Sequence, residues 1–211
     1  IQQLQRRKYR AEKICKTELQ KMFNLPVKPD TPVIALISRL VAHKGLDLVR
    51  TVIEEVLRED VQVIILGKGD SAYENYFSDL ARRYVGKFVS VIAFNPDLSR
   101  KIYSGADLFL MPSKSEPCGL SQMIASRYGT VPIVRETGGL YDSIKPVGNG
   151  GNGFTFAAYN AYDMLYVIRE AINCYRNKDF WPELVKRVMS VDFSWQHSAK
   201  EYEKVYGEML K

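Results

Sequence analysis

The sequence predicts an α/β fold built on a doubly wound parallel sheet, and two observations support this prediction. Short apolar segments rich in β-branched residues alternate with longer amphipathic segments, as strands and crossover helices do in a parallel sheet. Several of these apolar segments show no alternation of polar and apolar residues, which is typical of strands buried on both faces. With 211 residues, 46% of them hydrophobic, the chain is long enough to bury the core of one such domain.

The first predicted element is a helix over residues 1–24. Its narrow apolar stripe consists of Leu4, Ala11, Cys15, Leu19 and Met22. Pro26, Pro29 and Pro32 then break the chain before the first strand. We therefore expect residues 1–28 to form a basic helix and linker outside the sheet, and residues 29–193 to form the main domain.

The alternating elements of the main domain follow in order. Strands are predicted over residues 33–37, 61–66, 88–93, 108–111 and 131–134. The helices between and after them are predicted over residues 46–59, 72–84, 98–105 and 120–128, with a short one near Leu140. A glycine-rich turn over residues 148–153 then leads to a last short strand over residues 154–156.

Three helices are predicted to close the chain, over residues 161–177, 181–190 and 195–210. Ser194 is placed to cap the last of them, which we treat as a separate unit over residues 194–211. The apolar side of this last helix carries Trp195, Ala199, Tyr202, Val205, Tyr206 and Met209. The predicted architecture is thus a single α/β domain with extra helices at both ends.

The net charge of +6 comes from the N-terminal segment alone. Residues 1–28 hold eight of the 30 basic side chains and two of the 24 acidic ones. A basic patch confined to one terminal helix is weaker evidence for nucleic-acid binding than a basic face across a domain. We expect this helix to be solvated or to contact a partner, and we expect no nucleic-acid ligand.

Other features narrow the class of protein further. No apolar run approaches the roughly 20 residues that span a bilayer, and no signal peptide opens the chain, so we expect no membrane contact and a cytoplasmic location. Cys15, Cys118 and Cys174 are far apart, which disfavours a disulfide framework or a zinc site. His43 and His197 have no ligand partners at a suggestive spacing, so we predict no bound metal.

Polar and glycine-rich residues gather after the predicted strands, where an open parallel sheet has its binding crevice. Arg39 and Lys44 are two cations that follow the first strand. Thr137, Gly138 and Gly139 supply backbone N–H groups at a predicted helix N-terminus. Cations and such a terminus suit a diphosphate. The alternatives are solvated surface charges and an ordinary turn.

The loop over residues 112–120 carries a carboxylate and a thiol. Pro117 keeps Glu116 out of helical geometry, so this carboxylate can accept hydrogen bonds from sugar hydroxyls or stabilise developing positive charge. The alternative is a first-turn acid of the next helix. We expect Cys118 to pack against a ligand rather than act as a nucleophile, because no base lies near it in sequence. Phe94, at a strand end, either stacks on a base or belongs to the core.

Several motifs resemble the C-terminal half of bacterial-type glycogen synthases and plant starch synthases, which are retaining glycosyltransferases. They stand in the family's order and spacing over nearly the whole chain, at residues 38–40, 44–48, 112–120, 127–135, 137–140 and 192–195. The Glu-Pro-Cys-Gly-Leu motif at residues 116–120 is specific to this family. Wider retaining glycosyltransferases usually have a second glutamate eight residues after the first, where this chain has Ile124.

The resemblance implies a GT-B fold, in which two Rossmann-like domains face each other and the C-terminal one holds the sugar-nucleotide donor. It implies transfer of glucose from ADP-glucose to the non-reducing end of an α-1,4-glucan with retention, without a further cofactor, in the cytoplasm or in a plant plastid. The family's N-terminal Lys-Thr-Gly-Gly-Leu loop and acceptor-binding residues are not found here. We therefore expect an isolated donor-binding half that binds ADP or ADP-glucose without full activity.

The resemblance also assigns roles to individual residues. Arg39 and Lys44 bind the diphosphate and stabilise the leaving ADP, and Glu116 contacts the glucosyl ring near the reacting centre. The donor-binding set is Arg39, Lys44, Phe94, Cys118, Gly119, Leu120, Thr137, Gly138 and Gly139, with Phe94 stacked on adenine. The family usually has Arg-Arg where this chain has Arg135 and Glu136, so Glu136 brings a negative charge near the proposed phosphate site.

Two other functions remain open at this stage. One is a related transferase that uses UDP-sugars and another acceptor. The other is a non-catalytic module in which the nucleotide site is vestigial and the basic N-terminal helix docks a partner. Comparing the binding of ADP-glucose and UDP-glucose distinguishes the first alternative from an ADP-glucose transferase. Substitution of Arg39 distinguishes the second, because ligand binding by a vestigial site would not change.

Overall fold

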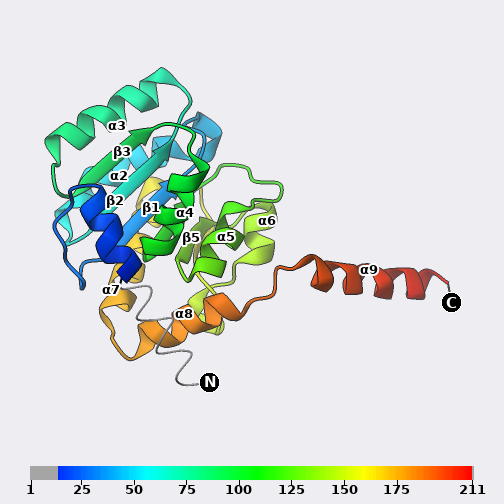
Figure 1. Ribbon diagram of the computed structural model, residues 1–211. Helices are drawn as coiled ribbons and strands as arrows, with labels where there is room; N and C mark the ends of the chain where they lie inside the picture. The colour runs from blue at the N-terminus through cyan, green and yellow to red at the C-terminus, as the bar shows by residue number, and fades with distance from the viewer. Residues whose placement is uncertain (1–13, 211) are drawn as a thin grey trace.

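A computed structural model of the protein describes residues 14–210. Within this range, six strands form one sheet in the order β3-β2-β1-β4-β5-β6, and every neighbouring pair is parallel (Figure 1). The strands are β1 (Val33–Ile37), β2 (Gln62–Gly67), β3 (Phe88–Ile92), β4 (Leu108–Met111), β5 (Val131–Arg135) and β6 (Phe154–Phe156). The predicted α/β class with a parallel sheet is confirmed.

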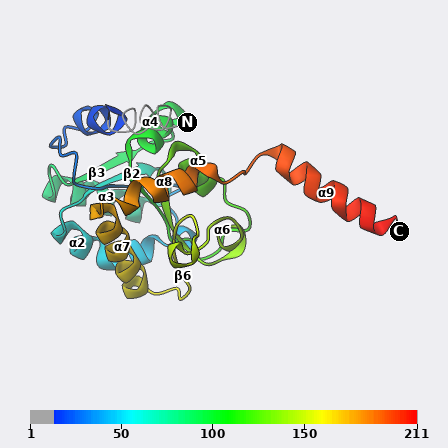
Figure 2. The same ribbon diagram turned by 90° about the horizontal axis from the view of Figure 1, so that it is seen from below.

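Helices connect the strands and cover both faces of the sheet (Figures 1 and 2). They are η1 (Ala42–Lys44), α2 (Leu46–Arg58), α3 (Ser71–Arg83), α4 (Pro96–Gly105), α5 (Ser121–Tyr128), α6 (Gly138–Ser143), η2 (Val147–Asn149), α7 (Ala161–Arg176), α8 (Phe180–Ser190) and α9 (Trp195–Met209). The predicted boundaries either match these or differ from them by one or two residues. The short helices η1 and η2 were not predicted, and α4 begins at Pro96, two residues before the predicted start.

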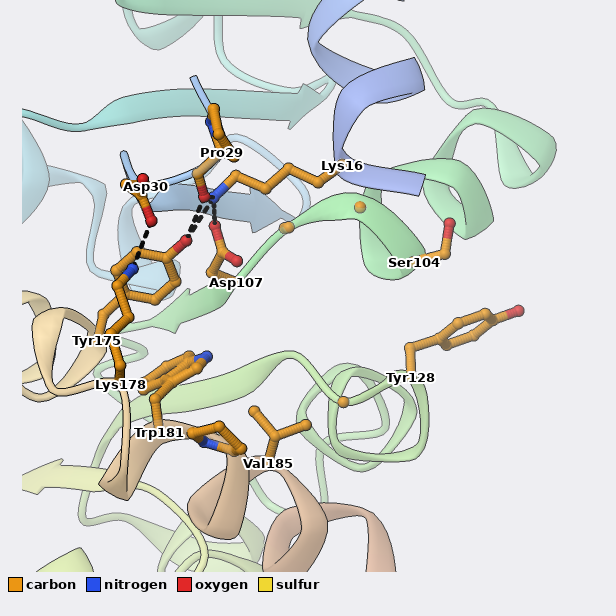
Figure 3. Close-up of a pocket in the computed structure, with 14 residues that line it drawn as sticks. Lys16, Pro29, Asp30, Ser104, Asp107, Tyr128, Tyr175, Lys178, Trp181 and Val185 are labelled. Carbon is orange, nitrogen blue, oxygen red and sulfur yellow. Dashed lines mark hydrogen bonds and ion pairs between the residues drawn. The ribbon is translucent and has the colours of Figure 1, made fainter. Parts of the chain in front are cut away.

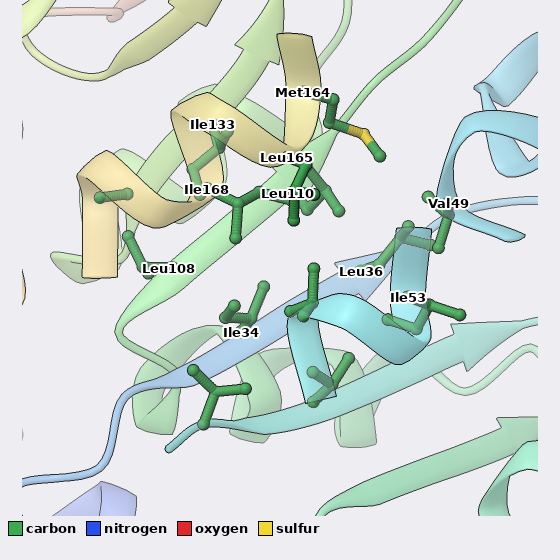
Figure 4. Close-up of a cluster of buried hydrophobic side chains, with 14 of the residues drawn as sticks. Ile34, Leu36, Val49, Ile53, Leu108, Leu110, Ile133, Met164, Leu165 and Ile168 are labelled. Atoms are coloured by element: carbon green, nitrogen blue, oxygen red, sulfur yellow. The ribbon is translucent and has the colours of Figure 1, made fainter. Parts of the chain in front are cut away.

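Two apolar cores lie on opposite faces of the sheet because successive strand residues point to opposite sides. Ile34 and Leu36 of β1 face one core, which α2, α3, α7 and α8 cover, whereas Val33 and Ala35 face the other, which α4, α5 and α6 help to cover. Figure 4 shows the first core, where side chains of β1, β4 and β5 meet those of α2 and α7. Burial on both faces explains why these strands lack a polar–apolar alternation.

The order of the strands fixes where a ligand can bind. The chain runs from β1 outward through β2 to β3, then returns to β4 on the other side of β1 and continues outward to β6. The direction of winding therefore reverses between β1 and β4. In open α/β sheets, the crevice at the carboxyl ends of the strands on either side of such a reversal is the usual ligand site.

Residues 14–22 are helical, and this helix packs against the domain only in part through the residues that the sequence predicted. Leu19 is buried as expected, but Met22 is 44% exposed and Gln20 is fully buried. The Gln20 side chain donates to the Gln62 side chain (2.8 Å) and to the Lys28 carbonyl (3.1 Å). These two acceptors satisfy the amide nitrogen of Gln20, whereas its buried side-chain oxygen has no hydrogen-bond partner among the described residues. The earlier part of the predicted helix, residues 1–13, lies outside the described residues.

The last helix, α9, extends away from the body of the domain (Figure 1). The Ser194 hydroxyl accepts from the His197 amide (3.3 Å), so the predicted cap is confirmed. None of the α9 residues is buried, and Trp195 is 86% exposed. Among the described helices, none has both the length and the apolar composition that a membrane span requires.

Candidate functional site

A cavity of about 180 Å³ opens at the carboxyl ends of β1 and β4, at the reversal of the strand order. Both predicted cations of the first loop, Arg39 and Lys44, line it. Ser113 lines it from the loop after β4, and Ser121 lines it from the first turn of α5. The cavity therefore combines fixed positive charge, hydroxyl groups and a helix N-terminus, which together suit an anionic ligand.

The loop that carries the two cations is held tightly against the loop after β4. Gly45 ends η1 with a φ of 76°, a conformation that favours glycine. A Cβ atom at Gly45 would lie 2.0 Å from the carbonyl oxygen of Pro112, so only glycine allows this approach. The Lys114 amide donates to the His43 carbonyl (2.9 Å). These contacts fix the position of Lys44 relative to the loop of residues 112–120.

Lys44, which lines the cavity, forms an ion pair with Glu116. Lys44 Nζ lies 2.6 Å from Glu116 Oε2, and the Ser113 hydroxyl donates to the same carboxylate oxygen (3.1 Å). Both charged side chains are largely buried, with 16% and 11% of their surfaces exposed. The carboxylate is thus held in the loop by a cation and a hydroxyl, and it does not act as a first-turn acid of α5.

The N-terminus of α6 packs directly against the loop that carries Glu116. The Gly139 amide donates to the carbonyl oxygens of Glu116 (3.0 Å) and Pro117 (3.2 Å). A Cβ atom would lie 2.3 Å from the Glu116 oxygen if added at Gly138, and 1.9 Å from the Cys118 oxygen if added at Gly139. The paired glycines therefore permit a close approach of two loops, and the Gly139 amide serves this packing. Thr137 occupies the N-cap position without a side-chain capping bond.

The remaining predicted site residues are distributed around this centre. Gly119 and Leu120 directly precede α5, whose Ser121 reaches the cavity, and Cys118 is exposed beside them. Phe94 follows β3, two strands from β1, and is 90% exposed. The alternative that Phe94 belongs to the core is therefore wrong. The structure brings Arg39, Lys44 and Glu116 together with the two glycine-containing helix starts, whereas Phe94 is not among the residues that line the cavity.

Glu136 is turned away from the cavity. Its carboxylate accepts a hydrogen bond from the Thr155 hydroxyl on β6 (2.7 Å), and its amide donates to the Phe156 carbonyl (2.9 Å). The negative charge that the sequence places near the proposed phosphate site is thus directed toward the edge strand.

Three further residues of the site were not predicted from the sequence. Ser113 contacts Glu116, and His43 Nε2 lies 3.3 Å from Arg39 Nη2. Gln122 is fully buried, and its side-chain nitrogen donates to the Gly119 carbonyl (2.9 Å) and to the Ser143 hydroxyl (3.1 Å), which ties α5 to α6. The only signal in the sequence was the position of Ser113 and Gln122 beside the predicted motif.

A second cavity, of about 140 Å³, lies at the opposite ends of the strands, beside Asp107, which directly precedes β4 (Figure 3). Here Lys16 Nζ lies 2.7 Å from Asp107, 2.7 Å from the Tyr175 hydroxyl and 3.2 Å from the Pro29 carbonyl oxygen. Three acceptors match the three N–H donors of the ammonium group, so this charge is already satisfied within the protein. We interpret this cluster as a structural clamp rather than a ligand site. In residues 14–210, no group of three or more His, Cys, Asp or Glu residues is placed to hold a metal ion.

Comparison with known proteins agrees with this geometry. Over 93% of its own length, the chain is 51% identical to the glycogen synthase of Bacillus cereus (strain Q1) and 50% identical to that of Geobacillus thermodenitrificans. A solved catalytic domain of Starch Synthase IV from Arabidopsis thaliana, bound to ADP and acarbose, matches 93% of the chain with a TM-score of 0.86 and 35% identity.

These matches cover less than half of the longer proteins. The chain spans 42% of the Bacillus cereus relative and 42% of the Arabidopsis chain. The family described as "Glycosyl transferases group 1" matches residues 18–183, which include the whole sheet, the cavity between β1 and β4 and the Lys44–Glu116 pair. The chain is a Rossmann-like domain of GT-B type, and it belongs to the glycosyl transferases group 1 family.

Proposed function

We propose that this chain is the donor-binding half of a glucan synthase that transfers glucose from ADP-glucose to the non-reducing end of an α-1,4-glucan with retention. The observation that carries the proposal is the contact between two loops at the reversal of the strand order. One loop brings Arg39 and Lys44, and the other brings Glu116, whose carboxylate lies 2.6 Å from Lys44 Nζ.

In this proposal the two cations neutralise the diphosphate. An ADP leaving group carries negative charge that grows as its bond to glucose breaks, and preorganised cations stabilise such charge in the transition state. An ammonium group has three donors, and Glu116 takes one of those of Lys44, so two remain for phosphate oxygens. The guanidinium of Arg39 can bind phosphate in a bidentate manner.

Glu116 is proposed to face the glucosyl ring. Lys44 and Ser113 both contact the same carboxylate oxygen, Oε2, so the other oxygen can accept from sugar hydroxyls or face positive charge at the reacting carbon. Because Lys44 contacts Glu116 and lines the cavity proposed for the diphosphate, it links the two halves of the donor. The names of the relatives, glycogen synthase and starch synthase, support a glucan product.

Transfer itself is proposed to need more than this chain. The chain spans 42% of its relatives, and the glucan acceptor is proposed to bind with the help of the part that it does not match. We expect the chain to bind ADP and ADP-glucose and not to incorporate labelled glucose into glycogen. Measurable incorporation by this chain would contradict that expectation.

Titration calorimetry with ADP, ADP-glucose and UDP-glucose tests the proposal, together with Arg39→Ala. We expect ADP and ADP-glucose to bind more tightly than UDP-glucose. Loss of a charge-assisted hydrogen bond should weaken ADP binding by at least about 1–3 kcal/mol in Arg39→Ala, or roughly 5- to 150-fold. Arg82→Ala is the matched control, because Arg82 is an exposed arginine on α3.

The possible outcomes separate the alternatives. Absence of heat at millimolar nucleotide, with folded protein, would contradict a nucleotide site. Tighter binding of UDP-glucose would assign the chain to a UDP-sugar transferase. Unchanged ADP binding by Arg39→Ala would place the ligand elsewhere and favour the non-catalytic module.

A further inference from the structure

Arg135, the last residue of β5, connects the loop after β4 with the loop after β6. The proposed mechanism gives this residue no role. Its Nε donates to the Ser113 carbonyl (2.9 Å), its Nη2 donates to the Lys114 carbonyl, and its Nη1 donates to the Ala157 carbonyl (3.3 Å). All three acceptors are backbone oxygens in loops that follow β4 and β6. The guanidinium is therefore a clamp on the shape of these loops, and the first of them carries Glu116.

The ring of Tyr159, which lies in the same loop as Ala157, extends this clamp to the start of α2. The guanidinium of Arg135 and the ammonium of Lys114 each lie 5.5 Å from the ring centroid. The Tyr159 hydroxyl donates to Asp47 Oδ1 (2.5 Å). Burial and this hydrogen bond to the carboxylate raise the pKa of Tyr159, so the hydroxyl stays protonated as a donor throughout the neutral range.

These contacts give a second connection between the two chain segments that carry Lys44 and Glu116. Asp47 lies in the first turn of α2, three residues after Lys44, and Ser113 lies three residues before Glu116. The path from Asp47 through Tyr159 and Arg135 to Ser113 thus joins the same two loops that the Lys44–Glu116 pair joins directly. Two independent connections between two loops restrict their separation more than either does alone.

We propose that Arg135 and Tyr159 are positioning residues that set the distance between Lys44 and Glu116, and thereby the affinity of the site for a nucleoside diphosphate. This inference rests on the proposed function for its ligand. Arg135 contacts loop carbonyls, and Tyr159 also packs against the first apolar core. Because Tyr159→Phe keeps the ring and removes only the hydroxyl, its effect falls on loop order and less on global stability.

Tyr159→Phe and Arg135→Lys test the inference. The first removes only the hydroxyl that reaches Asp47, and the second keeps the charge but cannot span three carbonyls. We expect each to weaken ADP binding between about threefold and tenfold. The matched controls are Tyr166→Phe and Arg169→Lys, on the exposed side of α7, where these side chains contact Glu170, Glu55 and Glu59.

Hydrogen exchange without ligand gives a second readout that does not depend on nucleotide binding. The Lys114 amide, which donates to the His43 carbonyl, should exchange faster in both variants, and strand amides of β1, β2 and β4 should not. Unchanged exchange at Lys114 would overturn the inference, and so would unchanged ADP affinity of both variants where the unsubstituted chain binds ADP. Faster exchange across the whole sheet would also overturn it, since that indicates a general structural role.

The two proposals fail in different ways. If the unsubstituted chain does not bind ADP, the proposed function is wrong, and the exchange of Lys114 still decides whether Arg135 and Tyr159 order the loops. If the unsubstituted chain binds ADP and both variants bind it equally well, the site stands and the positioning role is wrong.

Discussion

At the scale of single residues, Gly138 and Gly139 contribute to the site because they have no side chain that would collide with the neighbouring loop. The sequence indicated that Gly138 and Gly139 expose backbone donors to a ligand. In the structure, the Gly139 amide donates to Glu116 and Pro117, and both glycines allow α6 to approach the loop over residues 112–120. The lack of a side chain therefore brings the elements of the site together.

Substitution of Gly139 by alanine tests this role. The added Cβ would lie 1.9 Å from the Cys118 oxygen, so either α6 or the Glu116 loop has to move. Overpacking of this kind costs about 1–3 kcal/mol of unfolding free energy, and we expect ADP affinity to fall as well. Chemical denaturation and calorimetry measure the two effects.

Gly148→Ala is the matched control, because nothing lies within 4 Å of a Cβ atom at that position. We expect its stability and its nucleotide affinity to stay close to those of the unsubstituted chain. Equal behaviour of the two alanine variants would show that the close approach at Gly139 is not needed.

The charged residues of the site could be predicted because the strand ends identify them. Arg39, Lys44 and Glu116 each follow an apolar strand, and parallel strands bring such residues to one edge. The pairing of Lys44 with Glu116, the contact of His43 with Arg39 and the bracing by Tyr159 depend on how loops distant in sequence fold over one another. Nothing in the local pattern of residues encodes these contacts.

At the scale of elements, the helix over residues 14–22 shows where periodicity fails as a guide. Apolar spacing identified Leu19 as buried, but it also indicated Met22 and passed over Lys16 and Gln20. A stripe of apolar residues reports burial only where the partner surface is apolar. Here the partners are Asp107, the Tyr175 hydroxyl and backbone carbonyls, so polar side chains face inward.

Lys16→Met tests the clamp that joins Lys16 to Asp107, directly before β4 (Figure 3). Removing the ammonium leaves Asp107 buried without its cation, and breaking such a buried pair costs about 3–5 kcal/mol. Chemical denaturation should show a loss of this size, with ADP affinity unchanged because the clamp lies at the opposite ends of the strands from the proposed site.

Lys21→Met serves as the control for this change. Lys21 pairs with Glu18 on the same helix, but both side chains are about 60% exposed, and such pairs contribute about 0–1 kcal/mol. A loss in Lys16→Met no larger than that in Lys21→Met would contradict a stabilising role for the buried pair.

At the scale of the whole molecule, the order of the strands connects the sequence to the site. The pattern of residues predicted the class of fold and most elements to within one or two residues. The order β3-β2-β1-β4-β5-β6, which puts the reversal between β1 and β4, depends on long-range packing. In this order, the loops after β1 and β4 become neighbours although 72 residues separate Lys44 from Glu116.

Two of the cavities in the described part of the chain carry opposite expectations. The cavity between β1 and β4 has cations available for an anionic ligand, and the one beside Lys16 has its cation paired with Asp107. A crystal structure of the chain with ADP tests the central claim most directly. We predict that the diphosphate lies within hydrogen-bonding distance of Arg39 and Lys44; nucleotide bound beside Lys16, or anywhere away from the carboxyl ends of β1 and β4, would contradict it.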